Sequence, residues 1–138
     1  PGNHGLPLEP YLSKIGRARW PYAFAWKALR EAGARIAFGT DWPVSDIDPL
    51  WSIQSALTRA RWADDLPDNR QSLHQALASY TAEGAYAGFM EETTGKLKEG
   101  MLADLCMLPV DLQKTEPASF KGITPRMTVC DGRVVFER

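Results

Sequence analysis

The stretch Ala34-Arg-Ile-Ala-Phe-Gly-Thr-Asp-Trp-Pro-Val44 decides the fold of this chain. Residues 35–39 form a short, largely apolar run, which predicts a strand buried on both faces of a parallel sheet. Two small residues then lead to the carboxylate of Asp41, and Pro43 prevents a regular continuation. Barrel enzymes present catalytic groups where a buried strand ends. Asp41 is therefore the first candidate for chemistry.

A predicted helix precedes this strand. The apolar spacing over Pro21–Ala32 fits an amphipathic helix with its proline in the first turn. Gly33 supplies the left-handed residue that commonly ends a helix. Helix, short link and buried strand together make half of an α/β repeat.

Two further helices are predicted after the Asp41 loop. Asp48 suits an N-cap and Pro49 the first helical position, so a helix is expected from there to about residue 61. Ser72 and Gln75 form a capping-box pattern, and a helical run follows to about Gly88.

The composition changes near Glu91, and short strands are predicted beyond it at residues 102–108, 126–130 and 133–137. The last two flank Asp131-Gly132, a pair suited to a two-residue hairpin turn. The order of elements indicates an α/β end piece followed by a β module. A single buried parallel strand needs neighbours, so these must come from sequence outside the 138 residues or from another copy.

Composition limits the classes of partner. The 138 residues carry 16 basic and 17 acidic side chains, a net charge of −1, which gives no electrostatic case for nucleic acid or an anionic membrane. No apolar run approaches the length of a membrane span and no signal peptide is visible. A cytoplasmic protein is expected. The chain begins with Pro1 rather than Met, which favours a trimmed or truncated product.

Cys106 and Cys130 are the only cysteines, and each lies in an apolar, strand-like run. We expect two reduced thiols in the core rather than a disulfide. They lack the close Cys/His spacing of a structural zinc site.

Asp41 has two interpretations from its local pattern. A carboxylate at a strand end can bind a divalent metal or take a proton from metal-bound water. It can equally begin an Asx-turn before Trp42 and Pro43. Trp42 in turn either lines a pocket beside Asp41 or belongs to the core, as most of the five tryptophans should.

The two histidines do not form a metal motif. His4 lies in a turn-rich segment at the start of the chain, where a mobile terminal histidine is expected. His74 lies beside the apolar face of its helix, which favours a solvated surface position. Neither His-x-His nor His-Glu-x-x-His occurs.

Taken in order, these segments resemble the C-terminal portion of metal-dependent amidohydrolases, in particular a subgroup that includes N-substituted formamide deformylases. Residues 38–44 look like the last barrel strand and its loop, and residues 72–82 like the helix that follows. Residues 94–105 resemble the return into a small β-sandwich, and residues 129–136 its closing hairpin. Each motif is only moderately specific, whereas the ordered set is strongly so.

The resemblance implies a (β/α)8 TIM-barrel fold. Residues 1–90 would supply the last α/β units of the barrel, and residues 91–138 part of the β-sandwich. In such enzymes the aspartate after strand eight completes a divalent metal site, typically of zinc, and shuttles a proton. Asp41 matches that aspartate as catalytic residue and metal ligand. Pro1-Gly-Asn-His4 resembles a Gln-Pro-x-His segment without its Gln, which would bring His4 near the pocket mouth.

The His-x-His pair, the bridging ligand and the later histidines of that family have no counterparts here. The chain resembles roughly the last quarter to third of a complete amidohydrolase. We therefore expect an incomplete fold that hydrolyses no amide-like substrate alone. One alternative is a non-catalytic module that associates with itself or with a partner, because an unpaired strand and an incomplete sandwich expose apolar surface. Another is an enzyme split over two chains.

Overall fold

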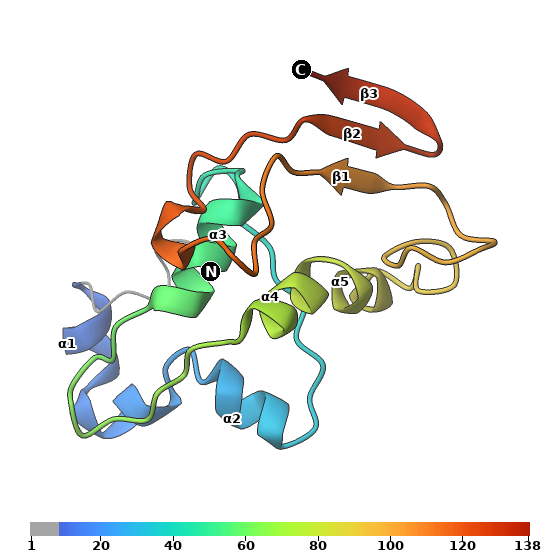
Figure 1. Cartoon of the computed structure of the whole chain (residues 1–138). Helices are drawn as coiled ribbons and strands as arrows, with labels where there is room; N and C mark the ends of the chain where they lie inside the picture. Colours follow the sequence, from blue (N-terminus) through green and yellow to red (C-terminus); the bar gives the residue numbers. More distant parts are fainter. Residues whose placement is uncertain (1–8) are drawn as a thin grey trace.

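In a computed structural model, residues 9–138 are described. Short helices occupy the first two thirds of the chain, and three strands lie in the last third (Figure 1). The helical elements are α1 (Tyr11–Ile15), the 3₁₀ helix η2 (Arg17–Tyr22), α2 (Trp26–Glu31), α3 (Pro49–Thr58), α4 (Leu73–Tyr80), α5 (Ala82–Ala87) and the 3₁₀ turn η3 (Pro117–Ser119).

The expected helix starts before α3 and α4 are confirmed. The Leu50 amide donates to Asp48 Oδ1 at 2.9 Å, so Asp48 caps α3. The Gln75 amide donates to Ser72 Oγ at 3.2 Å, and the Ser72 amide donates to Gln75 Oε1 at 2.9 Å, which completes the capping box of α4. These bonds satisfy amides that have no partner inside their helix.

All three expected helices are shorter than predicted. The helix after Asp48 ends at Thr58 rather than near residue 61. The helix expected from Pro21 begins only at Trp26, because Phe24 adopts a φ of +50° that no helix accommodates. The run expected to continue to Gly88 breaks at Thr81, whose φ of −123° and ψ of −96° separate α4 from α5. The predicted stop after α2 is confirmed, since Gly33 has a φ of +87°.

The strand expected at Arg35–Gly39 is not formed. The segment is extended but pairs with no strand, and its residues are exposed or only partly buried rather than enclosed on both faces. It is held near its end by the Phe38 amide, which donates to the Ser79 carbonyl at 3.0 Å. A strand exists only through its neighbours, and among residues 9–138 none lies beside this segment.

The three strands form one antiparallel sheet in the order β1 (Leu105–Met107), β2 (Met127–Cys130) and β3 (Arg133–Glu137). The hairpin between β2 and β3 turns at Asp131 and Gly132, whose φ values of +49° and +73° are those of a type I′ turn. A register shift between Thr128 and Val129 marks an irregularity against β3. The predicted strands are confirmed, the first of them shorter than expected.

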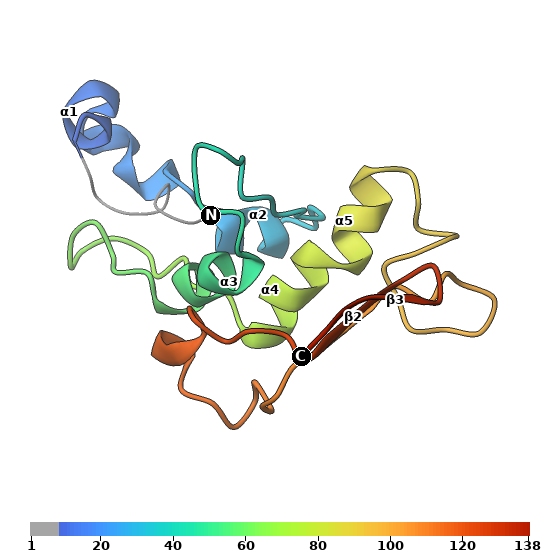
Figure 2. The same ribbon diagram turned by 90° about the horizontal axis from the view of Figure 1, so that it is seen from above.

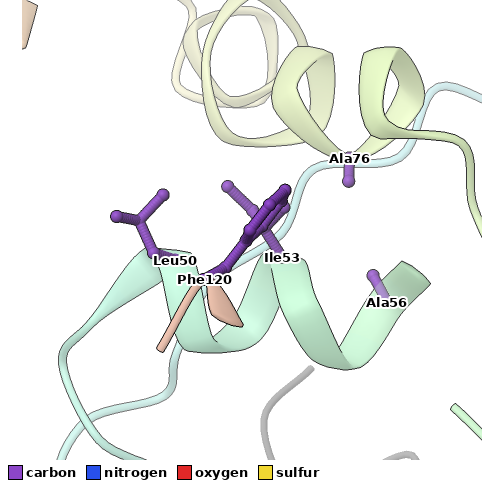
Figure 3. Close-up of a cluster of buried hydrophobic side chains, with 5 residues drawn as sticks. All are labelled: Leu50, Ile53, Ala56, Ala76 and Phe120. Carbon is purple, nitrogen blue, oxygen red and sulfur yellow. The ribbon is translucent and has the colours of Figure 1, made fainter. Parts of the chain in front are cut away.

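A small core joins the helices to the later part of the chain. Figure 3 shows the ring of Phe120 lying against Ile53 of α3, with Ala76 of α4 opposite. The buried members of this cluster are Leu50, Ile53, Ala56, Ala76 and Phe120. Phe120 comes from the region beyond residue 90, so the two predicted parts share this cluster. The division at residue 90 itself stays a prediction.

The sheet stands away from the helices (Figures 1 and 2) and, within the described part of the chain, contacts none of them. Its strands leave Val134, Val135 and Phe136 between 42% and 61% exposed. The whole chain exposes 9038 Å², against about 7,200 Å² for a compact monomer of 15.4 kDa. The fold is therefore a small, open α/β arrangement and not a closed barrel.

The cysteine prediction is half right. Cys106 and Cys130 are free thiols, as expected, but both are exposed rather than in the core. Their strands belong to the sheet that packs on no helix, so the apolar runs around them have no layer to be buried against.

Candidate functional site

Asp41 lies at the end of the extended segment that follows α2. Its φ of +55° places the residue in the left-handed region. The Val44 amide donates to the Asp41 carbonyl at 2.7 Å and closes a tight turn over Trp42 and Pro43. The loop thus bends sharply at the residue that carries the carboxylate.

The Asp41 side chain is exposed and, among residues 9–138, accepts no hydrogen bond. The turn is closed through its backbone carbonyl, so the Asx-turn alternative is not what the structure contains. The carboxylate is therefore free to act as a ligand or as a proton acceptor.

Trp42 belongs to an exposed apolar group in the same loop. Trp42, Val44 and Ile47 are each 66% exposed. The core alternative for Trp42 does not hold in this structure. An exposed indole next to Asp41 is compatible with a substrate-lining role, which stays a prediction.

The other carboxylates of the loop have structural partners. Asp46 Oδ1 accepts from the Asp48 amide at 3.2 Å, and Asp48 caps α3. Between them and Asp41, Ser45 is buried and its hydroxyl has no hydrogen-bond partner. Ser45 is thus the point at which the loop returns to the body of the protein.

The residues described do not fit a metal on their own. From residue 9 onward, no three His, Cys, Asp or Glu side chains gather closely enough to hold an ion. His74 is exposed, as predicted for a surface histidine. The prediction for His4 lies outside the described residues. Asp41 is therefore a single candidate ligand.

A partly buried ion pair between α2 and α5 was missed by the sequence reasoning. Arg30 Nη1 of α2 donates to Glu83 Oε1 of α5 at 2.7 Å, and Arg30 Nη2 donates to Ser79 Oγ of α4 at 2.8 Å. The Arg30 guanidinium holds the pKa of Glu83 below its ordinary value. No local pattern pairs residues that lie 53 positions apart.

Aromatic contacts were missed for the same reason. Phe38 lies between Trp26, with ring centroids 5.1 Å apart, and Tyr80, with centroids 5.9 Å apart. Burial raises the pKa of Tyr80. Its hydroxyl is buried and has no hydrogen-bond partner among the described residues.

A hollow lies away from Asp41. Its volume is 320 Å³, and it is lined by Lys27, Arg30, Glu31, Asp68, Arg70 and Gln75. Its three cations are each paired with a carboxylate, and Arg70 lowers the pKa of Asp68 to about 2. Because the charges are already neutralised, this hollow is not an anion site.

Comparison with known proteins gives a consistent result. The amidohydrolase family matches residues 5–136. The amidohydrolase YtcJ of Bacillus subtilis (strain 168) is 33% identical over 147 aligned residues, which cover 96% of this chain and 28% of that protein. The N-substituted formamide deformylase of Arthrobacter pascens is 25% identical, over 83% of this chain and 22% of that protein.

A solved structure is similar as well. The crystal structure of an uncharacterized metal-dependent hydrolase from Pyrococcus furiosus superposes with a TM-score of 0.54 at 32% identity, covering 62% of this chain and 17% of that one. The chain thus spans about a quarter of the length of the curated relatives named above.

Over residues 9–138, no helix is long and apolar enough to cross a bilayer.

Proposed function

The chain belongs to the amidohydrolase family, and from that premise we propose that it is part of a metal-dependent hydrolase that cleaves carbon–nitrogen bonds of small, amide-like substrates. The names of the similar hydrolases from Pyrococcus furiosus and Arthrobacter pascens support the metal dependence and the substrate class. The observation that carries the proposal is the carboxylate of Asp41 at the end of the segment after α2, which is exposed and has no hydrogen-bond partner among residues 9–138.

Asp41 is proposed as the general base and acid of the reaction. Its carboxylate accepts a proton from the attacking water and returns that proton to the departing nitrogen. The turn at residues 41–44 leaves the carboxylate exposed to solvent, and no side chain of the described part of the chain donates a hydrogen bond to it. Trp42 and His4 are proposed to line the substrate pocket, since both flank this end of the barrel in the proposed fold.

A divalent metal, for which we propose zinc, would supply a water of lowered pKa. Of the described residues we propose only Asp41 as a ligand, because residues 9–138 hold no group of three His, Cys, Asp or Glu side chains that could bind an ion. The 138 residues by themselves are therefore proposed to be inactive. Residues 1–90 are proposed to form the last α/β units of a (β/α)8 barrel, and residues 91–138 part of a β-sandwich.

Two measurements test this proposal. The purified 138-residue protein, incubated with zinc, is expected to retain no stoichiometric metal by elemental analysis and to hydrolyse no N-substituted formamide. Zinc retained at one equivalent together with amide hydrolysis would overturn the inactivity.

The role of Asp41 is tested in a hybrid, in which this chain replaces the matching region of the Arthrobacter pascens deformylase. Asp41→Asn in that hybrid is expected to lower kcat by about 10²–10⁴-fold. Asp46→Asn is the matched control, since Asp46 bonds only to a loop amide. Equal activity in the two variants would remove Asp41 from the reaction.

A second candidate function is a non-catalytic, self-associating module. The sheet that contacts no helix and the excess of exposed surface favour it, because uncovered strands and apolar faces promote association. Light scattering during size exclusion distinguishes the two: a well-behaved monomer counts against this candidate.

A further inference from the structure

The segment that carries Asp41 is held at separate points, one of which is the Arg35 guanidinium 3.9 Å from the centre of the Tyr86 ring. At its beginning, the Ala34 amide donates to the Leu29 carbonyl at 3.0 Å. Near its end, the Phe38 amide donates to the Ser79 carbonyl at 3.0 Å. A strand in a sheet would hold each residue by ladder bonds, and this segment has no such ladder among the described residues. The placement of Asp41 must therefore come from other contacts.

Phe38 provides such contacts three residues before Asp41. Its ring lies edge-on between Trp26 of α2 and Tyr80 of α4, at centroid distances of 5.1 Å and 5.9 Å with interplanar angles of 63° and 66°. Such tilted arrangements are the favoured geometry for aromatic pairs. The ring also packs against the buried cluster of α3 and α4. Backbone and side chain of Phe38 are thus both anchored to the helical layer.

Asp41 lies only three residues beyond this anchor, which limits its Cα to within about 10 Å of the Phe38 Cα. On the other side, the chain is held again at Ser45, which is 7% exposed. Between these two points the Asp41 side chain itself bonds to nothing in the described residues. Its position is therefore set through the backbone, from Phe38 and Ser45.

We propose that Phe38 is a positioning residue for Asp41: the Trp26–Phe38–Tyr80 aromatic row holds the end of the segment and so fixes where the carboxylate is presented. The inference rests on the proposed role of Asp41 for its catalytic meaning. The physical claim, that the ring orders residues 39–41, is independent of any activity.

Amide ¹⁵N relaxation of the isolated chain tests the claim. In Phe38→Leu, which keeps an apolar side chain but removes the ring, order parameters of residues 39–41 are expected to fall from about 0.85 to below about 0.6. Those of α3 and α4 should stay unchanged. Phe38→Tyr keeps the ring and is expected to retain the order of the wild-type loop. The matched control is Phe136→Leu on β3, far from the row.

A second pair of variants controls for the case in which Phe38→Leu does not fold correctly. Tyr80→Leu removes the other ring of the row and is expected to loosen the same three amides, whereas Tyr80→Phe keeps the ring and should not. Unchanged order in both leucine variants would overturn the proposal, and so would an equal loss of order throughout α3 and α4. The relaxation experiment involves no substrate or metal. Its result can therefore be interpreted even if the proposed function is wrong.

Discussion

At single positions, the space around the backbone decides which side chain is tolerated. Gly95 packs against the break between α4 and α5 with a φ of +87°. A Cβ built there would lie 2.6 Å from Ala85 Cβ and 3.0 Å from the Thr81 carbonyl oxygen. Neither atom belongs to a flexible side chain that can move aside. Glycine is therefore required by contact as well as by conformation.

Gly95→Ala is expected to lower the free energy of unfolding by two effects. The positive φ costs about 1–2 kcal/mol, and the overlap with Ala85 adds about 1–3 kcal/mol. Urea unfolding, monitored by circular dichroism, measures the total loss in the free energy of unfolding. Gly100→Ala is the matched control, because Gly100 has the same φ of +87° but nothing within 4 Å of the added Cβ. Equal losses in the two variants would show that the overlap is relieved by local movement.

At the level of elements, local hydrogen bonds place the hairpin. Asp104 Oδ1 accepts from the Asp131 amide at 2.8 Å, and Asp104 Oδ2 accepts from Thr94 Oγ1 at 2.8 Å. These two bonds tie the loop before β1 to the turn between β2 and β3. They favour the ionised carboxyl, so the pKa of Asp104 is lowered from its ordinary value of 3.8, mainly by the Asp131 amide.

This lowered pKa predicts the pH dependence of the hairpin. A carboxyl whose pKa is lower in the folded than in the unfolded chain stabilises the fold above the unfolded value. The contribution is lost as the pH falls from about 4 through the folded pKa. In Asp104→Asn the acid-induced loss of hairpin structure, followed by the amide resonance of Asp131, is expected to become less steep.

The effect is screened by solvent, since the carboxyl of Asp104 is exposed. Glu99→Gln serves as the control, because Glu99 is exposed and accepts no hydrogen bond in the described chain. A change of the same size in Glu99→Gln would indicate a general charge effect and not the Asp104 bonds.

For the whole molecule, exposed surface is the dominant property. The excess of about 1,800 Å² over a compact monomer exceeds the roughly 800 Å² that each partner buries in an interface of standard size. The sheet contributes exposed apolar side chains to this surface, among them Val135 at 61% exposed. Apolar side chains exposed in this way favour burial against another polypeptide.

The 138-residue protein is therefore expected to self-associate in solution. Val135→Lys on β3 should shift the molar mass measured by light scattering toward the monomer, because a charge on an edge strand opposes pairing. Leu29→Lys on α2, at a position 53% exposed, is the control and should change the measured molar mass less. A wild-type monomer at all concentrations would contradict the expectation.

The sequence by itself determined the features that depend on a few neighbouring residues. The caps at Asp48 and Ser72, the helix stop at Gly33 and the turn at Asp131-Gly132 were all predictable. Each rests on one side chain or one backbone angle acting within three residues. The ordered motifs also indicated the amidohydrolase family and made Asp41 the candidate residue, whose role stays a prediction.

Only the tertiary structure decided the features that depend on distant partners. The segment at residues 35–39 is no strand, because pairing requires neighbours that the sequence pattern cannot supply. Phe120 completes the core from far along the chain, and Cys106 is exposed because its sheet meets no helix. The surroundings of Asp41 follow from the same cause. Its anchor is the contact of Phe38 with Trp26 and Tyr80, and such packing arises only once the chain has folded.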